Sequence, residues 1–243
     1  LSETNFWWII LSRLVLLLAH FVRSIRWGLL LAAVGFGVPK RMLFAATMSG
    51  YAANLAIPRI GEIARCWVLK RTNNISISPG IGTLIIERLT DVFVLFVLLL
   101  IFGIAEHDAV YKISGDVFQQ LNRTHLLIGM ILLAVAGVIT IWLIRKKQLF
   151  RDFVNGVIIG LKSLVLLQTK WEFLLQTLSI WFLYACSFII AFQAFNLEPE
   201  MPIPSLLFTF ILSGLAWMVP VQGGIGAFHW MVVQELLLYG ISE

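Results

Sequence analysis

Residues 81–104 read IGTLIIERLTDVFVLFVLLLIFGI, and this stretch decides the fold class. Most of its side chains are apolar, with Glu87, Arg88 and Asp91 near its start. An apolar run of about 20 residues is long enough to cross roughly 30 Å of hydrocarbon as a helix. A spanning strand needs only about ten residues and alternates in and out, which this run does not do. The stretch therefore predicts a transmembrane helix that carries charges into the bilayer.

The composition extends this prediction to the whole chain. The 243 residues are 60% hydrophobic and only 13% charged, with a mean hydropathy of +0.92. Soluble domains carry roughly 25% charged residues, so this chain lacks the charge to cover a soluble surface. Further apolar runs at 6–22, 126–144 and 171–195 predict a polytopic, all-α transmembrane helix bundle. We expect one transmembrane domain over 1–243, truncated at the N-terminus, with truncation at the C-terminus left open.

The net charge of +5 predicts an orientation and no nucleic-acid partner, because the basic residues sit at the ends of apolar runs. Arg145, Lys146, Lys147 and Arg151 follow the run 126–144 and mark a cytoplasmic end. Arg23, Arg26 and the interfacial residue Trp27 follow the run 6–22 and are interpreted in the same way. Cys66, Cys186 and the four histidines show no metal-ligand spacing, and we expect no metal and no cofactor.

Two regions are too short and too interrupted for ordinary spans. Residues 28–38 and 42–57 are apolar but are separated by Pro39-Lys40-Arg41, and residues 205–219 and 227–239 are separated by a Gly-rich break at 220–226. Such pairs are typical of re-entrant hairpins or broken helices, whose exposed backbone groups must be buried in protein or line a wet cavity. The alternative is ordinary short or tilted spans.

Two further segments predict amphipathic helices at the cytoplasmic surface. In residues 59–71, an apolar stripe at Ile60, Ile63, Ala64, Trp67 and Val68 recurs with helical spacing. Arg59, Glu62 and Arg65 occupy another face of the same helix. In residues 149–165, large apolar side chains recur every four residues. Both segments are predicted to lie near the membrane interface.

The charges near the start of the span 81–104 predict an ionic network. Glu87 and Asp91 are four residues apart on one helical face, where two carboxylates repel unless cations intervene. Each charge at membrane depth costs roughly 2.5–3.5 kcal/mol on the mild insertion scale, so these groups must be paired or hydrated. We predict a network of Arg59, Glu62 and Arg65 with Glu87, Arg88 and Asp91. It is either a lock between helices or a cavity, open to the cytoplasm, for a charged headgroup.

The Gly-rich break is the second candidate site. Gly223, Gly224 and Gly226 precede a predicted helix, and free N–H groups at such a position can meet an anion. Gln222 and His229 are the polar side chains beside them. The alternative for the glycines is a tight turn that lets helices pack closely, and for His229 a packed, hydrogen-bonded residue.

Several motifs in order resemble the lysylphosphatidylglycerol synthase transmembrane-region family, whose members are also called flippase-like membrane proteins. They are Arg26-Trp27, Asn54–Pro58, Arg59-x-Gly61-Glu62-x-x-Arg65, Glu87-Arg88-Leu89-x-Asp91 and Pro220-x-x-Gly223-Gly224-x-Gly226. The resemblance covers nearly the whole chain and implies a helical bundle with re-entrant helices. It also implies a role in moving aminoacylated phosphatidylglycerol, or isoprenoid- or hopanoid-type lipids, between leaflets.

The chain departs from that family's pattern in two ways. His229 stands where the family usually has an acidic residue, which puts a carboxylate role at this position in doubt. The soluble aminoacyl-transfer domain of the bifunctional members is not among these 243 residues, so we do not expect them to synthesise the aminoacyl lipid.

The leading hypothesis is a lipid translocase or lipid-binding transporter, not an enzyme, in a bacterial or archaeal cytoplasmic membrane. Its headgroup site would draw on the charged network together with Asn54, Gln222, the three glycines and His229. The partner would be an anionic, aminoacylated or isoprenoid-linked lipid, with a lipid-synthesising enzyme as a further partner and a homodimer as one option. The alternatives are an intramembrane lipid-modifying transferase that uses Glu87, Asp91 and His229, and a non-catalytic scaffold that docks a partner through 145–170.

Overall fold

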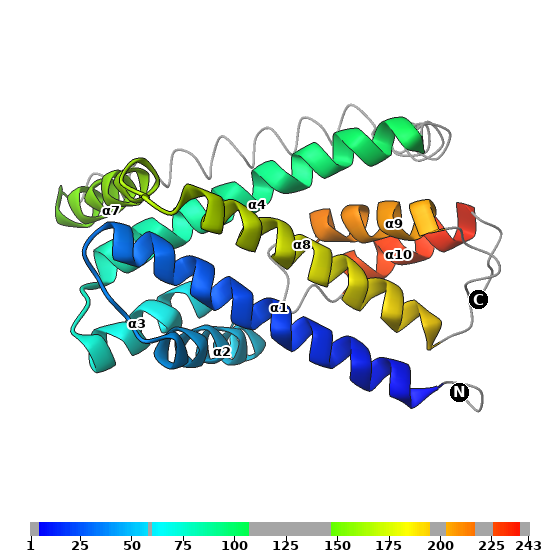
Figure 1. The fold of residues 1–243 in the computed structure, drawn as a ribbon, viewed down its shortest axis with the longest axis horizontal. Helices are drawn as coiled ribbons and strands as arrows, with labels where there is room; N and C mark the ends of the chain where they lie inside the picture. The colour runs from blue at the N-terminus through cyan, green and yellow to red at the C-terminus, as the bar shows by residue number, and fades with distance from the viewer. Residues whose placement is uncertain (1–4, 58–59, 107–146, 195–202, 217–225, 239–243) are drawn as a thin grey trace.

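The computed structural model describes residues 5–57, 60–106, 147–194, 203–216 and 226–238, and these form eight α-helices (Figure 1). No strand occurs within these ranges, which confirms the predicted all-α fold. The helices are α1 (Phe6–Ala33), α2 (Lys40–Ala56), α3 (Gly61–Asn73), α4 (Ile77–Ala105), α7 (Lys147–Val165), α8 (Lys170–Gln193), α9 (Ile203–Ala216) and α10 (Ala227–Leu238).

The bundle is built around two long helices that lie side by side. Helices α1 and α8 run in opposite directions along the long axis of the molecule and pack against each other over much of their length (Figure 1). Helix α4 packs against α7 near its start and against α9 further along, while α2 and α3 pack together beside α1. Helix α10 packs against α9.

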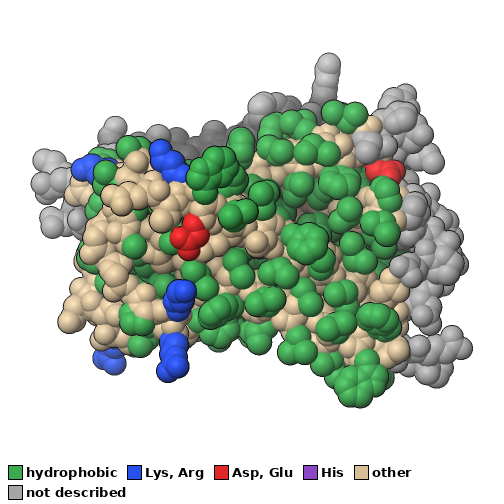
Figure 2. Space-filling model, viewed as in Figure 1, with side chains coloured by type: hydrophobic (Ala, Val, Ile, Leu, Met, Phe, Trp, Pro, Cys, Tyr) green, Lys and Arg blue, Asp and Glu red, His purple; other side chains and the backbone are tan. Residues whose placement is uncertain are grey.

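The outer surface carries the apolar side chains expected of a membrane bundle. Helices α1 and α8 are long and apolar enough to cross a membrane. Large side chains such as Trp7, Phe93 and Phe182 are exposed on α1, α4 and α8, and hydrophobic side chains cover most of the face in Figure 2. In water this surface would be unfavourable, whereas in a bilayer it contacts lipid. Inside, Ser12 of α1 and Ser187 of α8 exchange hydrogen bonds at 2.7 and 3.0 Å.

The first helix is longer than the sequence predicted. Helix α1 continues through Arg23, Arg26 and Trp27 to Ala33, so residues 28–33 are its last turns and not a separate short segment. Arg23, Arg26 and Trp27 do not mark a helix end, because α1 continues for six residues past Trp27. All three side chains are buried inside the bundle. The chain reverses after Ala33 through Gly35, whose φ of 91° suits glycine, and α2 begins at Lys40.

Helix α4 begins earlier than predicted. The span was predicted to start at residue 81, but α4 starts at Ile77, three residues after the left-handed Asn74 that ends α3. Pro79 lies in the first helical turn, where the backbone nitrogens have no intrahelical acceptor and a proline is tolerated. The whole helix has 29 residues and is not interrupted.

Both predicted amphipathic segments are helical, but each has a buried face that the sequence did not reveal. In α3, Ile63 and Trp67 of the apolar stripe are exposed, while Arg65 faces inward. Helix α7 is more than a surface helix, because Gly156 and Gly160 bring its backbone against Gly82 of α4. This small-xxx-small spacing is typical of close helix packing in membranes.

Several predictions lie outside the described residues. They concern the span 126–144 and the break at 220–225. They also include the orientation signal at Arg145 and Lys146.

Candidate functional site: a buried ionic cluster

Five charged side chains from three helices meet inside the bundle, and we call them the ionic cluster. Helix α4 places Glu87 and Asp91 on one face, four residues apart. Helix α1 supplies Arg23 and Arg26, three residues apart, and α3 supplies Arg65. The predicted need for cations between the two carboxylates is confirmed, because Arg23 pairs with both of them.

Glu87 is held by two arginines from different helices. Arg23 Nε donates to Glu87 Oε1 at 2.6 Å, and Arg65 Nη2 donates to Glu87 Oε2 at 3.3 Å. The side chain of Glu87 is fully buried. This carboxylate therefore ties α4 to both α1 and α3.

Asp91 is also held by two arginines, both from α1. Arg23 Nη2 donates to Asp91 Oδ2, and Arg26 Nη2 donates to Asp91 Oδ1 at 2.7 Å. The sequence placed Asp91 in a network with Arg59, Arg65 and Arg88. Among the described residues, its carboxylate pairs instead with Arg23 and Arg26, which that network did not include. All four carboxylate oxygens of the cluster accept from a guanidinium.

Aromatic and hydroxyl groups surround the arginines. The guanidinium of Arg65 lies 4.3 Å from the ring centroid of Trp27, whose indole N–H donates to Thr83 at 3.0 Å. A cation over an aromatic face is stabilised by the ring quadrupole, most strongly when water is excluded. Arg26 donates to Thr177 of α8 at 3.2 Å.

A second polar contact joins the cluster to α8 and α2. Arg23 Nη1 donates to the hydroxyl of Tyr184 on α8 at 3.1 Å, and this hydroxyl lies 3.5 Å from Nδ1 of His20. The ring of His20 in turn packs against Tyr51 of α2, with centroids 4.4 Å apart. Four helices besides α4 therefore contribute side chains to this polar core: α1, α2, α3 and α8.

The cluster contains more positive than negative charge. Three arginines face two carboxylates, which leaves one net positive charge among these five side chains. Nε of Arg26 and Nε of Arg65 are buried and have no acceptor among the described residues. A buried charge without a partner is costly, as is a buried donor without an acceptor. The arrangement therefore favours one additional anion.

Glu62 and Arg88, which were predicted to join the same network, form a separate pair. Arg88 Nη2 lies 3.0 Å from Glu62 Oε1, and the two side chains are 47% and 30% exposed. The pair lies outside the ionic cluster and links α3 to α4 at the surface. Exposed pairs of this kind contribute little to stability.

Arg88→Gln should therefore change the stability of the protein by no more than about 0.5–1 kcal/mol. The measurement is the apparent melting temperature of the purified variant in detergent. A large loss of stability would contradict this expectation and would extend the ionic cluster to the surface pair. A small loss makes Arg88→Gln a matched arginine control for the buried positions.

The other predicted site residues lie elsewhere or outside the described ranges. Asn54 Oδ1 accepts from the backbone N–H of Gly61 at 2.7 Å, which helps to start α3. Gly226 has a φ of 90° just before α10. His229 is exposed on α10, its ring 5.8 Å from that of Phe228. Arg59, Gln222, Gly223 and Gly224 are not among the described residues. The binding roles of all these residues stay predictions.

The α1 half of the cluster was not predicted from the sequence. Arg23 and Arg26 are three residues apart and so share a helical face, which was a usable signal for a buried arginine pair. They were interpreted as a helix end because basic residues after an apolar run usually mark one. The Gly156-x-x-x-Gly160 spacing was also visible in the sequence and was not used.

Comparisons with known proteins identify the family. A family model described as "Lysylphosphatidylglycerol synthase TM region" matches residues 1–243, the whole chain. No curated protein and no solved structure matches the chain.

Proposed function

Because the chain belongs to the lysylphosphatidylglycerol synthase transmembrane-region family, an integral membrane family linked to lipid biosynthesis or transport, we propose that it is a lipid translocase or lipid-binding transporter. In this proposal the ionic cluster receives the anionic headgroup of the lipid. The protein moves or holds the lipid and does not modify it.

The excess positive charge of the cluster is the observation that carries this proposal. A phosphodiester brings about one negative charge, which would neutralise the third arginine. Its oxygens could also accept from Nε of Arg26 and Nε of Arg65, the two buried donors that have no acceptor among the described residues. Arginine suits this task because its planar fork binds two phosphate oxygens at once.

Headgroup entry requires the cluster to exchange partners. Arg26 is the arginine best placed for this exchange, because Asp91 keeps Arg23 when Arg26 turns away. Arg65 binds Glu87 at 3.3 Å, a longer contact than the 2.6 Å between Arg23 and the same carboxylate. Arg23 would then hold the two carboxylates together while Arg26 and Arg65 bind the phosphate.

A static ion-pair lock is the competing interpretation. It is favoured by the pairing of every carboxylate oxygen in the cluster with an arginine, and by the near-complete burial of these side chains. A lock needs the charges only for stability, whereas a headgroup site also needs the third arginine for transport. The two interpretations therefore differ in what Arg26 does.

Arg26→Gln separates the two interpretations. The variant leaves two arginines facing two carboxylates, so no charge in the cluster loses its last partner and the protein should fold. If the cluster binds the headgroup, lipid movement should fall about ten- to a hundredfold, since a charge-assisted hydrogen bond contributes roughly 1.5–3 kcal/mol. The measurement is the rate at which fluorescent lipids cross the bilayer of reconstituted vesicles, read by quenching of the outer leaflet.

The control is Arg88→Gln, which removes an arginine outside the cluster. Phosphatidylglycerol, its lysyl ester and an isoprenoid phosphate would be compared with phosphatidylcholine. If no lipid moves faster with the native protein than in empty vesicles, the translocase proposal fails. If folded Arg26→Gln moves lipid at the native rate, the cluster is a lock and the headgroup binds elsewhere.

The lipid, the location and the partners belong to the same proposal. An anionic, aminoacylated or isoprenoid-linked lipid of a bacterial or archaeal cytoplasmic membrane fits the family resemblance and the charge of the cluster. A lipid-synthesising enzyme that supplies this lipid is the proposed protein partner. If incubation of the protein with a lipid yields a chemically altered lipid, the intramembrane transferase is favoured instead.

A further inference from the structure

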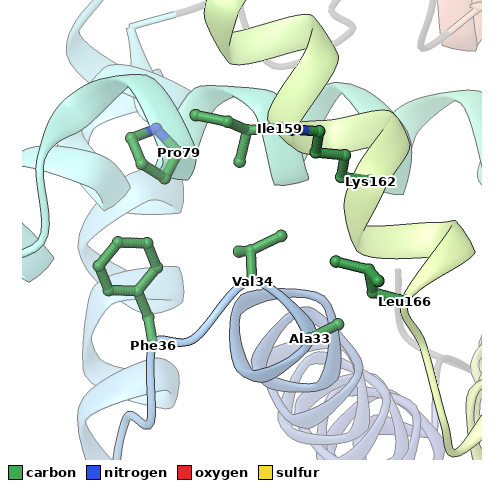
Figure 3. Close-up of a pocket in the computed structure, with 7 residues that line it drawn as sticks. All are labelled: Ala33, Val34, Phe36, Pro79, Ile159, Lys162 and Leu166. Atoms are coloured by element: carbon green, nitrogen blue, oxygen red, sulfur yellow. The ribbon is translucent and has the colours of Figure 1, made fainter.

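A pocket lies away from the ionic cluster. The pocket has a volume of about 360 Å³ and opens between the end of α1, the turn that follows it, the first turn of α4 and the face of α7 (Figure 3). Its walls are Ala33, Val34, Phe36, Pro79, Ile159, Lys162 and Leu166. Ligand pockets commonly measure about 300–1,000 Å³, so this volume suffices for part of a small amphipathic molecule.

The lining combines apolar walls with a single charge. Figure 3 shows Phe36, Val34 and Ala33 on one side, with Pro79, Ile159 and Lys162 facing them. Lys162 is exposed and pairs with no acidic side chain in the described part of the chain. An apolar cleft with one free ammonium is complementary to a molecule with an apolar tail and an anionic head.

The pocket lies at an end of the bundle that is rich in basic residues. It lies at the end of the bundle where Lys40 and Arg41 begin α2, where Lys70 and Arg71 lie in the last turn of α3, and where Lys170 begins α8. In Figure 2 the basic side chains of this face gather at that end. Basic helix ends mark the cytoplasmic interface, where anionic phospholipids are concentrated.

We propose that this pocket binds an anionic glycerophospholipid of the cytoplasmic leaflet, with part of one acyl chain between Phe36 and Ile159 and the phosphate on Lys162. The site goes beyond the proposed function, because it holds a lipid whether or not the ionic cluster moves one. Pro79 and Glu87 are eight positions apart on α4, so the pocket is about 12 Å from the cluster along that helix. Free phosphate has no apolar part to fill these walls, which favours a lipid over the ion alone.

Photolabelling tests the site directly. The native protein would be placed in phosphatidylcholine nanodiscs with a small fraction of phosphatidylglycerol that carries a diazirine on one acyl chain. After irradiation, mass spectrometry would map the labelled residues, and the diazirine analogue of phosphatidylcholine would serve as the comparison. We expect phosphatidylglycerol to label Phe36, Ile159 and Leu166 several-fold more than phosphatidylcholine does.

Three variants locate the contacts. Lys162→Gln should lower the preference for phosphatidylglycerol about two- to fivefold, the range expected for an exposed charge contact. Leu166→Trp should lower labelling by both lipids, because the larger ring would occupy part of the pocket that Leu166 lines. Leu166 is exposed, so folding should survive. Lys170→Gln removes an exposed lysine that does not line the pocket. This variant should change neither the preference for phosphatidylglycerol nor the overall labelling of the pocket.

Two results would overturn the proposal. One is equal labelling of the pocket by both lipids, since this would show that Lys162 selects no headgroup. The other is labelling of the pocket no stronger than that of outward residues of α8 such as Phe182, which would indicate only the surrounding bilayer. The readout is binding, so a failed transport assay with retained pocket labelling would reject the translocase and keep this site.

Discussion

Glu87→Gln should destabilise the protein by about 3–5 kcal/mol, because it removes one partner of a buried ion pair and leaves the other charge behind. Glu87 is fully buried and accepts from Arg23 and Arg65. Without its charge, the cluster would hold three arginines against Asp91 alone. The apparent melting temperature in detergent and the yield of monodisperse protein would both fall well below those of Arg88→Gln.

A second substitution tests whether the loss comes from charge. Arg65→Gln removes the cation that would be left without a carboxylate, so the double variant Glu87→Gln/Arg65→Gln should recover part of the lost stability. Neighbouring charges of this kind typically couple by 0.5–3 kcal/mol in a double-mutant cycle. Strictly additive losses would mean that Glu87 stabilises the bundle through packing alone, and the ionic cluster would lose its assigned role.

Gly82→Ala should be the most damaging small substitution outside the cluster. A Cβ at this position would overlap the carbonyl oxygen of Gly156 and come within 3.1 Å of the backbone nitrogen of Gly160. These are backbone atoms, so no side chain can turn away and α7 must shift as a whole. Overpacking of this kind costs typically 1–3 kcal/mol and occasionally more.

The measurement is again the apparent melting temperature, with Gly37→Ala as the control. A Cβ at Gly37 would meet no atom within 4 Å, so this variant has the same chemistry without the clash. Gly82 is five residues before Glu87 on α4, so a shift of the α4–α7 contact should also disturb the cluster. Equal melting temperatures for the two variants would contradict the close packing of α4 on α7.

The helical elements could be predicted from the sequence because their signal is local. Long apolar runs specify helices in a membrane, since only helices and closed barrels satisfy all backbone groups there. The prediction for α8 was accurate to within two residues at each end for this reason. The C-terminal end of α1 and the start of α4 were misplaced. In the local sequence, Arg26 after an apolar run and Pro79 both indicate a helix boundary.

Composition and apolar runs alone predict a helical membrane protein whose few charges must be paired. Glu87 and Asp91 on one face already required cations, because a charge in a bilayer is too costly alone. The identity of these cations depends on how the helices pack. Arg23 and Arg26 precede the carboxylates by more than 60 positions, and no local pattern encodes a contact across that distance. The packing of α1 against α4 makes them partners and leaves the third arginine in excess.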